Sequence, residues 1–389
     1  MSVESQPKET AHFSEWEILL KCASARLAPG QLELVGRGHQ WDKLLALAEA
    51  HGVVNRLAAA LGRANSASIP EEFRHKLLER QRAQTLSSLS LIAEMIRILD
   101  QFGAAGIQAL VLKGPALSLH AYGDAAARPY GDIDALIRHR DVLSATNLMV
   151  ALGFQAHVAP ETIAAGKIPG EYSFSRPNTK IIVELHTERT LRYFPSPLSV
   201  EDLFTRSVRL EFDDRRIPTL SAEDTLVSMC THGAKHFWER LMWIADVAAM
   251  LDRRADLDWN ASAAIAEELG AQRIVHTGLL LARDLLNTQL PDSVQDRIRA
   301  DAGASALVRK IKTWLPCGEG ASIGLLGRAL FRARMRRGVL AGLGYVARLS
   351  LSPTEDDWKK GHEQKQSPYR DAARRLVRLA GKYGSKTDR

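Results

Sequence analysis

Apolar residues recur at helical spacing over much of the first hundred residues. This spacing predicts helical structure over residues 16–27 and 41–64, the second segment interrupted near Gly52. A third predicted helix begins after Pro70, where two glutamates supply acids to the first turn, and it continues to Gly103. Residues 1–103 are therefore expected to form an N-terminal helical region.

The pattern changes after residue 103, where short apolar runs alternate with turn residues. Such runs are typical of buried strands, and helices are expected between them over residues 116–122 and 141–152. Residues 104–220 are thus expected to form an α/β core. The predicted strands cover residues 107–112, 132–137, 154–158, 172–175 and 180–186, the last two as a hairpin.

From residue 221 onward the spacing of apolar residues is again helical. Residues 221–389 are expected to form a C-terminal helical domain with a basic tail. The sequence therefore predicts an α+β protein, in which N-terminal and C-terminal helical regions flank a small mixed β-sheet. The predicted C-terminal helices cover residues 224–237, 239–252, 261–286, 293–300 and 325–348.

Composition narrows the class of protein. The chain has 389 residues, of which 46% are hydrophobic and 25% are charged. This balance is typical of a soluble globular protein with two or three domains, and it excludes a mostly disordered or collagen-like chain. The three cysteines lie far apart, which favours a reducing compartment. Because no apolar run is long enough to span a bilayer and the N-terminus is polar, a cytoplasmic protein is expected.

The formal net charge is +7, which favours anionic partners but also fits a basic protein that needs solubility. The segment from residue 323 to 348 carries arginines and no acidic residue. The arginines from Arg328 to Arg337 are candidates for a weak contact with an anionic surface. The favoured alternative is that they form the solvated face of a packed helix.

Two carboxylates stand out in the second predicted strand. Asp132 and Asp134 are two residues apart, so their side chains point to the same face, and their neighbours are apolar. Adjacent buried carboxylates repel each other unless a cation lies between them. A divalent metal such as Mg²⁺ meets that need. The alternative is a solvated strand end, where the two acids only cap backbone groups.

Glu184 is a third acid, in an otherwise mostly apolar strand. If its strand lies beside that of Asp132 and Asp134, three carboxylates converge, as in two-metal phosphoryl transfer. An ion pair with an arginine is the alternative role for Glu184. Gly114 follows a buried strand and precedes a helix, where backbone amides can approach a phosphate. Lys113 brings positive charge to the same place.

Arg128 also brings positive charge near the acids, either for a substrate or for an ion pair with Asp132 or Asp134. His232 and His236 share one face of a predicted helix. No glutamate follows His232 as in zinc proteases, so histidines satisfied within the fold are favoured over metal ligands.

The order of these motifs resembles that of a known family. The chain has Leu112-Lys113-Gly114, then a segment ending in Asp132-Ile133-Asp134, then Glu184-Leu185-His186, and then a helix with the pattern H-x-x-x-H-x-W-x-x-L-x-W-x-x-D from residue 232 to 246. This order resembles the bacterial uncharacterised nucleotidyltransferase family, within the polymerase-β-type nucleotidyltransferase superfamily. The resemblance implies a nucleotidyltransferase core that moves a nucleoside monophosphate from an NTP, such as ATP, to an acceptor hydroxyl and releases pyrophosphate.

The resemblance also implies roles for single residues. Asp132 and Asp134 would hold Mg²⁺, and Glu184 would complete a second metal site and act as general base on the acceptor. Gly114 and Lys113 would face the triphosphate, as would Arg128. By analogy with a lysine in the helical domain of related nucleotidyltransferases, Lys235 is a further nucleotide-binding candidate.

Two departures from the superfamily pattern keep other functions open. The third acid, Glu184, is a glutamate, which is longer than aspartate. Pro115 follows Gly114 where a second glycine or a serine is common, and proline lacks the amide that could hold a phosphate. A degenerate nucleotide-binding or scaffold protein is therefore one alternative. A toxin-type nucleotidyltransferase of a toxin–antitoxin pair is another, favoured by the basic C-terminal half. The acceptor is open: it is a small molecule, a sugar, RNA or a protein.

Overall fold

The structure is a computed structural model that describes residues 14–24, 40–63, 69–164, 170–187, 199–320 and 323–351. The expected basic tail and the end of the first predicted helix lie outside these ranges. Among the described residues, no helix has both the length and the apolar character needed to cross a membrane.

The N-terminal helices follow the predicted pattern. The expected interruption near Gly52 divides the segment 41–64 into two helices, because the chain turns at this glycine, which has a left-handed φ of 67°. A Cβ at this glycine would lie 2.5 Å from the sulfur of Met242, so no larger residue fits the turn without a shift. The helices are α1 (Glu15–Ala23), α2 (Trp41–Ala50), α3 (Val54–Arg63) and the continuous α4 (Glu71–Ala104).

A seven-stranded mixed sheet forms the centre of the α/β part, in the order β3-β4-β5-β2-β1-β7-β6. The neighbours β2 and β5 are parallel, as are β1 and β7, and the other pairs are antiparallel. This arrangement confirms the α+β class and the mixed sheet. The strands are β1 (Ala109–Val111), β2 (Ile133–Ile137), β3 (Gln155–Ala156), β4 (Glu171–Ser175), β5 (Ile182–His186), β6 (Val208–Phe212) and β7 (Arg215–Thr219).

The hairpin of β6 and β7 was not among the predicted strands. Strand β6 alternates apolar and charged residues, but β7 begins with two arginines and contains Pro218, so only one strand of the hairpin carries a period-2 pattern. The hairpin turns at Asp213, whose φ is 54°, and β7 extends the sheet by pairing with β1. Four helices accompany the sheet: α5 (Gly114–Tyr122), α6 (Val142–Ala151), α7 (Pro160–Ala164) and α8 (Val200–Thr205).

The C-terminal region is helical, but two predicted helices were wrong in length. The helix expected over 261–286 divides at Gly270, and the one expected over 325–348 divides at Gly338. Both glycines have left-handed φ, 57° and 89°. Gly270 directly follows the C-cap of the first helix of its pair, whereas Gly338 immediately precedes the second helix of its pair. The helices are α9 (Ala222–Lys235), α10 (Leu241–Arg253), α11 (Trp259–Glu268), α12 (Gln272–Leu286), α13 (Asp292–Arg299), the unpredicted α14 (Ala302–Trp314), α15 (Leu325–Arg334) and α16 (Val339–Leu351).

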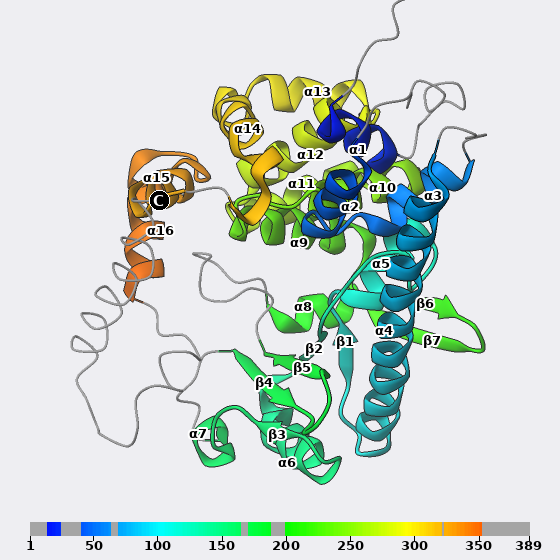
Figure 1. Cartoon of the computed structure of the whole chain (residues 1–389). Helices are drawn as coiled ribbons and strands as arrows, with labels where there is room; N and C mark the ends of the chain where they lie inside the picture. Colours follow the sequence, from blue (N-terminus) through cyan, green and yellow to red (C-terminus); the bar gives the residue numbers. More distant parts are fainter. Residues whose placement is uncertain are drawn as a thin grey trace, which may run out of the picture.

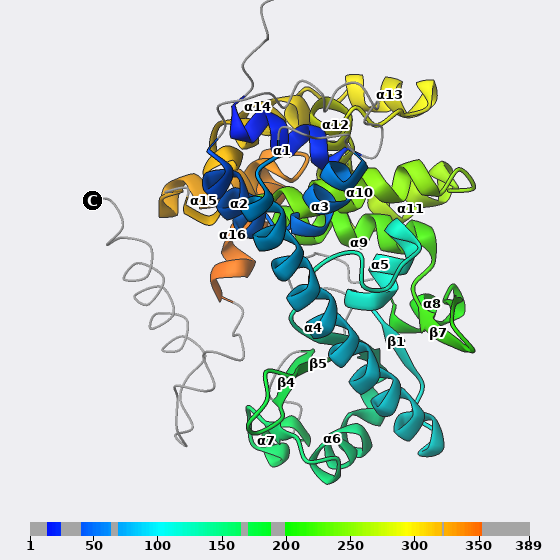
Figure 2. The same cartoon turned by 45° about the vertical axis from the view of Figure 1, so that its right-hand side comes forward.

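Two apolar cores hold these parts together. One core joins the first three helices to the C-terminal helices, so that residues such as Leu57 and Ile244 share it. The other joins the last turns of α4 to the sheet, with Phe102 beside strand residues such as Ile133. Figures 1 and 2 show α4 running from the helical part of the molecule down along the sheet. The expected domain boundaries at residues 103 and 220 stay a prediction.

Candidate metal and nucleotide site

The parallel pairing of β2 with β5 places two of the expected acids side by side. In the register of these strands Asp134 is the direct partner of Glu184. The Asp134 side chain is fully buried, whereas that of Glu184 is 24% exposed. The backbone N–H of Leu112 donates to the carbonyl of Asp134 over 3.0 Å, which fixes β2 against the end of β1.

Asp134 is contacted by two cationic groups. The Nζ of Lys113 lies 2.7 Å from its Oδ1, and the Nε2 of His186 lies 3.0 Å from the same oxygen. Burial alone would raise the pKa of Asp134, but Lys113 and His186 outweigh it and hold that pKa far below its usual value. The carboxylate is therefore ionised. Its other oxygen, Oδ2, is buried and has no hydrogen-bond partner among the described residues.

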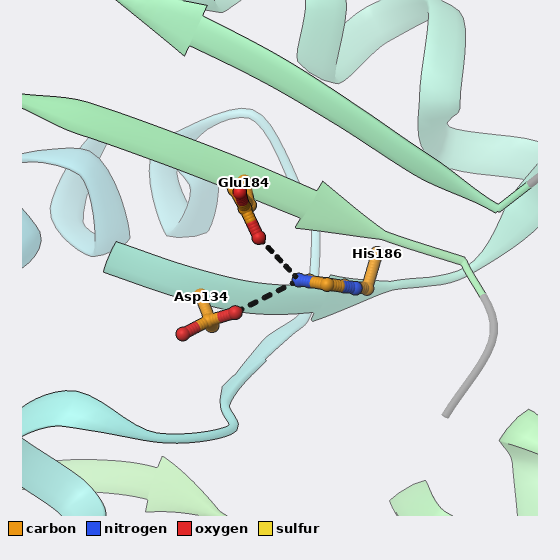
Figure 3. A group of neighbouring side chains, drawn as sticks. All are labelled: Asp134, Glu184 and His186. Atoms are coloured by element: carbon orange, nitrogen blue, oxygen red, sulfur yellow. Dashed lines mark hydrogen bonds and ion pairs between the residues drawn. The ribbon is translucent and has the colours of Figure 1, made fainter. Parts of the chain in front are cut away.

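His186 links the acids of two strands. Its Nε2 lies 3.6 Å from an oxygen of Glu184, and its Nδ1 lies 3.9 Å from Glu171 of β4. Figure 3 shows Asp134 and Glu184 converging on the imidazole. Burial would lower the pKa of His186, but the hydrogen bond to Asp134 and the contact with Glu184 raise it to about 9. His186 is thus an imidazolium at neutral pH.

These contacts gather a group with the composition of a metal site. Ligand atoms of Asp134, Glu184 and His186 all lie within 4.8 Å of one another, and together they could hold a metal ion. The pKa of Glu184 would be raised by burial, but it is lowered overall by the hydrogen bond to His186. Two ionised carboxylates and one imidazole therefore face a common point.

Asp132 lies at the edge of this group. Its side chain is half-buried, and its pKa is raised to about 6 by burial and by the charge of Asp134. Glu184 adds to this rise, while Lys113 and His186 oppose it. The structure thus places the three predicted acids within electrostatic reach of one another, with His186 rather than Asp132 in the tight group. Their predicted roles in catalysis stay predictions.

The turn from β1 into α5 has the expected glycine geometry. Lys113 precedes the helix, and Gly114 starts it with a left-handed φ of 53°. A Cβ at Gly114 would meet Tyr130 at 3.5 Å, an ordinary contact, so the backbone angle rather than space requires glycine. Burial would lower the pKa of Lys113, but Asp134 raises it overall, so the ammonium stays charged.

Arg128 has a partner other than Asp132 or Asp134. Its Nε lies 3.0 Å from Oδ2 of Asp246 in α10, and both side chains are buried. Tyr122 donates to the other oxygen of Asp246 over 2.7 Å. The ion pair thus fastens the loop before β2 to the C-terminal helices. A nucleotide-binding role for Arg128 stays a prediction.

The predicted histidine pair lies at the C-terminal end of α9, where His236 is the C-cap, and it has an aromatic neighbour. The rings of His232 and His236 have centroids 4.7 Å apart, and that of Trp243 lies 5.7 and 5.1 Å from them. Burial, together with the charge of Lys113, lowers the pKa of His232 well below its usual value, so its ring is neutral. Lys235 is exposed at the end of α9, and its role toward a triphosphate stays a prediction.

The residue that sequence reasoning missed as a site residue is His186. It was quoted only as part of the Glu184-Leu185-His186 motif. The available signal was the spacing, because residues two apart in a strand share a face and both face Asp134 once β5 lies beside β2.

Comparison with known proteins adds to this geometry. The chain is similar to the crystal structure of an antigenic nucleotidyltransferase-like protein from Paracoccidioides brasiliensis, with 16% identity and a TM-score of 0.30, over 56% of this chain and 92% of that one. A likeness at this level supports no argument about function. The search of curated proteins gave no significant match. The model of a family described as uncharacterised nucleotidyltransferases matches residues 37–287. This match spans well over half of the chain, so the chain belongs to the uncharacterised nucleotidyltransferase family.

Proposed function

We propose that the protein is a Mg²⁺-dependent nucleotidyltransferase, which moves a nucleoside monophosphate from an NTP to an acceptor hydroxyl and releases pyrophosphate. The observation that carries the proposal is the pairing of Asp134 with Glu184 across β2 and β5, with Asp132 two residues before Asp134. Membership of the nucleotidyltransferase family supports the same reaction class.

The donor set fits a hard divalent cation. Asp134 keeps a buried oxygen without a hydrogen-bond partner, and a buried polar atom of this kind needs a cation or a donor. Mg²⁺ prefers oxygen ligands, whereas imidazole suits zinc and similar metals. Because His186 is protonated at neutral pH, it donates to Asp134 rather than offering a lone pair. This leaves the oxygens of Asp132, Asp134 and Glu184 as the proposed ligands.

A bound Mg²⁺ would neutralise charge on the phosphates and keep the attacking and leaving oxygens in line. The protein's own groups would do the rest. The backbone at Gly114 is the first turn of α5, where free N–H groups favour a phosphate. Lys113 adds a positive charge beside that turn, although Pro115 contributes no amide.

Glu184 is the proposed proton acceptor. Its lowered pKa keeps it ionised at neutral pH, and its partial exposure lets an acceptor hydroxyl approach. Contacts with His186 orient the carboxylate. The proton of the hydroxyl would pass to Glu184 as the new phosphate ester forms and pyrophosphate leaves.

The proposal is tested with each of the four NTPs labelled at the α-phosphate. The protein is incubated with Mg²⁺, with and without a deproteinised cell extract as a source of acceptors. Transfer of label to an acceptor or to the protein itself is expected. It should be lost in Asp132→Asn with Asp134→Asn and retained in the matched Asp292→Asn variant, which changes an exposed acid on α13. Full activity of the double variant would refute the assigned roles.

One observation favours the second candidate, a nucleotide-binding protein without turnover. Lys113 and His186 already neutralise the buried Asp134, as a metal would. A site in which side chains already neutralise the carboxylate charge can bind a nucleotide without catalysing its transfer. Saturable NTP binding that needs no Mg²⁺, with no label transferred in the assay above, would support this second function.

A further inference from the structure

A cavity of about 670 Å³ lies near the far end of β2, the strand that carries Asp134. Strand β1 runs from the cavity, which Ala109 lines, toward Lys113 at the metal site. The antiparallel β2 starts beside Asp132 and ends next to Arg138, which also lines the cavity. None of the three acids is among the lining residues. The volume is within the range of small-molecule sites.

The inner wall of the cavity is apolar. Phe102 from the end of α4, Leu110 from β1 and Ile217 from β7 line it, and all three are buried in the fold. Phe204 from α8 adds a half-buried aromatic ring. Such a wall favours the hydrocarbon or aromatic part of a ligand, which loses contact with water on binding.

The rim is basic, and one of its arginines is held rigidly. The guanidinium of Arg138 contacts Glu201 at 2.7 and 2.9 Å and donates to Gln108 over 2.6 Å. It also lies over the ring of Phe204, 3.9 Å from the centroid. Arg138 is therefore neutralised and serves to shape the wall.

The other three lining arginines differ in their partners. Arg215 is paired with Asp100, the acid that lines the cavity, at 2.8 Å. Arg216 is paired with Glu211 at 2.9 Å. Arg209 is exposed on β6, and its side chain has no ion-pair or hydrogen-bond partner within the described ranges. One positive charge at the rim is thus left uncompensated.

We propose that this cavity is a second binding site, for a small amphipathic anion that carries one acidic group and an apolar body. The acidic group would pair with Arg209, and the body would lie against Phe204 and Ile217. The proposal rests on the composition of this cavity and not on the proposed nucleotidyl transfer, so either can fail without the other.

The first test uses the anionic fluorophore 8-anilinonaphthalene-1-sulfonate and its neutral analogue N-phenyl-1-naphthylamine, with the folded full chain. Gly103 lines the cavity, and a Cβ there would meet nothing within 4 Å, so Gly103→Leu should fill part of the space. Gly62→Leu is the matched control, since Gly62 is also helical, exposed and open. Saturable fluorescence enhancement with both probes should be weakened by Gly103→Leu and kept by Gly62→Leu.

The second test separates charge from apolar contact. Arg209→Gln should raise the dissociation constant of the sulfonate probe by about fivefold to tenfold and leave that of the neutral probe unchanged. Arg82→Gln, at an exposed arginine of α4 outside the cavity, should change neither. The proposal is overturned if the parent protein shows no saturable binding of the sulfonate probe. It is also overturned if Gly103→Leu or Arg209→Gln binds that probe as tightly as the parent.

Discussion

The Nε2 of His186 lies 3.0 Å from Oδ1 of Asp134, in a pair brought together by the parallel register of β5 with β2. The same oxygen accepts from Lys113. Two internal cations therefore stabilise a buried carboxylate at the position where a metal ion is proposed to bind. A bound metal ion should therefore partly replace the stabilisation that Lys113 and His186 give to the folded protein.

Lys113→Met tests this replacement. Removal of the ammonium leaves the charge of Asp134 balanced by His186 alone, so the metal-free variant should lose about 1–3 kcal/mol of unfolding free energy. Mg²⁺ should then raise the thermal midpoint of the variant more than that of the parent. Unfolding is followed by circular dichroism in EDTA and in Mg²⁺. Equal effects of Mg²⁺ on both proteins would show that Lys113 and the metal do not share this oxygen.

Arg128 is expected to matter for folding through Asp246. Arg128→Ala removes the ion-pair partner of the buried Asp246 and leaves the hydrogen bond from Tyr122, which should cost about 3–5 kcal/mol of unfolding free energy. The double variant Arg128→Ala with Asp246→Ala should lose less than the sum of the two single variants. Urea unfolding of all four proteins measures this coupling. If the losses of unfolding free energy in the two single variants add up in the double variant, Arg128 and Asp246 do not stabilise the fold as an ion pair.

Gly233 of α9 should tolerate no side chain. A Cβ there would lie 2.5 Å from the ring of Trp238, which is fully buried at the turn between α9 and α10. Gly233→Ala should therefore cost about 1–3 kcal/mol of stability by overpacking. Gly62→Ala, in an open part of α3, should be neutral or slightly stabilising. The thermal unfolding midpoints of both variants test this. An unchanged midpoint in Gly233→Ala would contradict the close packing of Trp238 against Gly233.

His51 predicts a pH dependence of stability. Burial lowers its pKa from 6.5 to about 4, and its Nδ1 accepts the backbone N–H of Leu241 over 3.2 Å. The unfolded chain takes up a proton at this residue below pH 6.5, whereas the folded chain does so only near pH 4. Stability should therefore fall as the pH falls through this window, by on the order of 3 kcal/mol from this group.

His51→Asn isolates this contribution. The amide oxygen can accept the same N–H bond but does not titrate, so the variant should lose less stability than the parent between pH 6.5 and 4. Urea unfolding at pH 4, 5, 6 and 7 gives the two slopes. Parallel slopes would show that His51 is not the group that binds the proton on unfolding.

Asp132 and Asp134 could be recognised as candidate site residues from the sequence, because the pattern that marks them is local. Asp132 and Asp134 interrupt an apolar strand, and their spacing alone places both on one face. The convergence with Glu184 was conditional on its strand lying beside that of Asp132 and Asp134, which the sequence alone does not give. The structure pairs Asp134 with Glu184, and the roles of the acids stay predictions. The spacing places His186 on the same face as Glu184, but its contact with Asp134 depends on the pairing of β5 with β2.

Other features were not predictable because they depend on tertiary contacts. The hairpin of β6 and β7 has a charged sequence and owes its place in the sheet to pairing with β1. Arg128 was expected near Asp132 or Asp134, but the partner it contacts is more than one hundred residues away, on α10. The helix breaks at Gly270 and Gly338 had a local signal, since both are glycines, yet glycine within a helical pattern is often tolerated.

The most direct measurement of the central claim is divalent cation binding together with nucleotide. Mn²⁺, as a paramagnetic probe for Mg²⁺, is titrated into the protein with a nonhydrolysable NTP, and free Mn²⁺ is followed by electron paramagnetic resonance. We expect saturable binding in the parent and in Asp292→Asn, and its loss in Asp134→Asn and in Glu184→Gln. Undiminished Mn²⁺ binding by both of these variants would contradict a metal site at the paired carboxylates of β2 and β5.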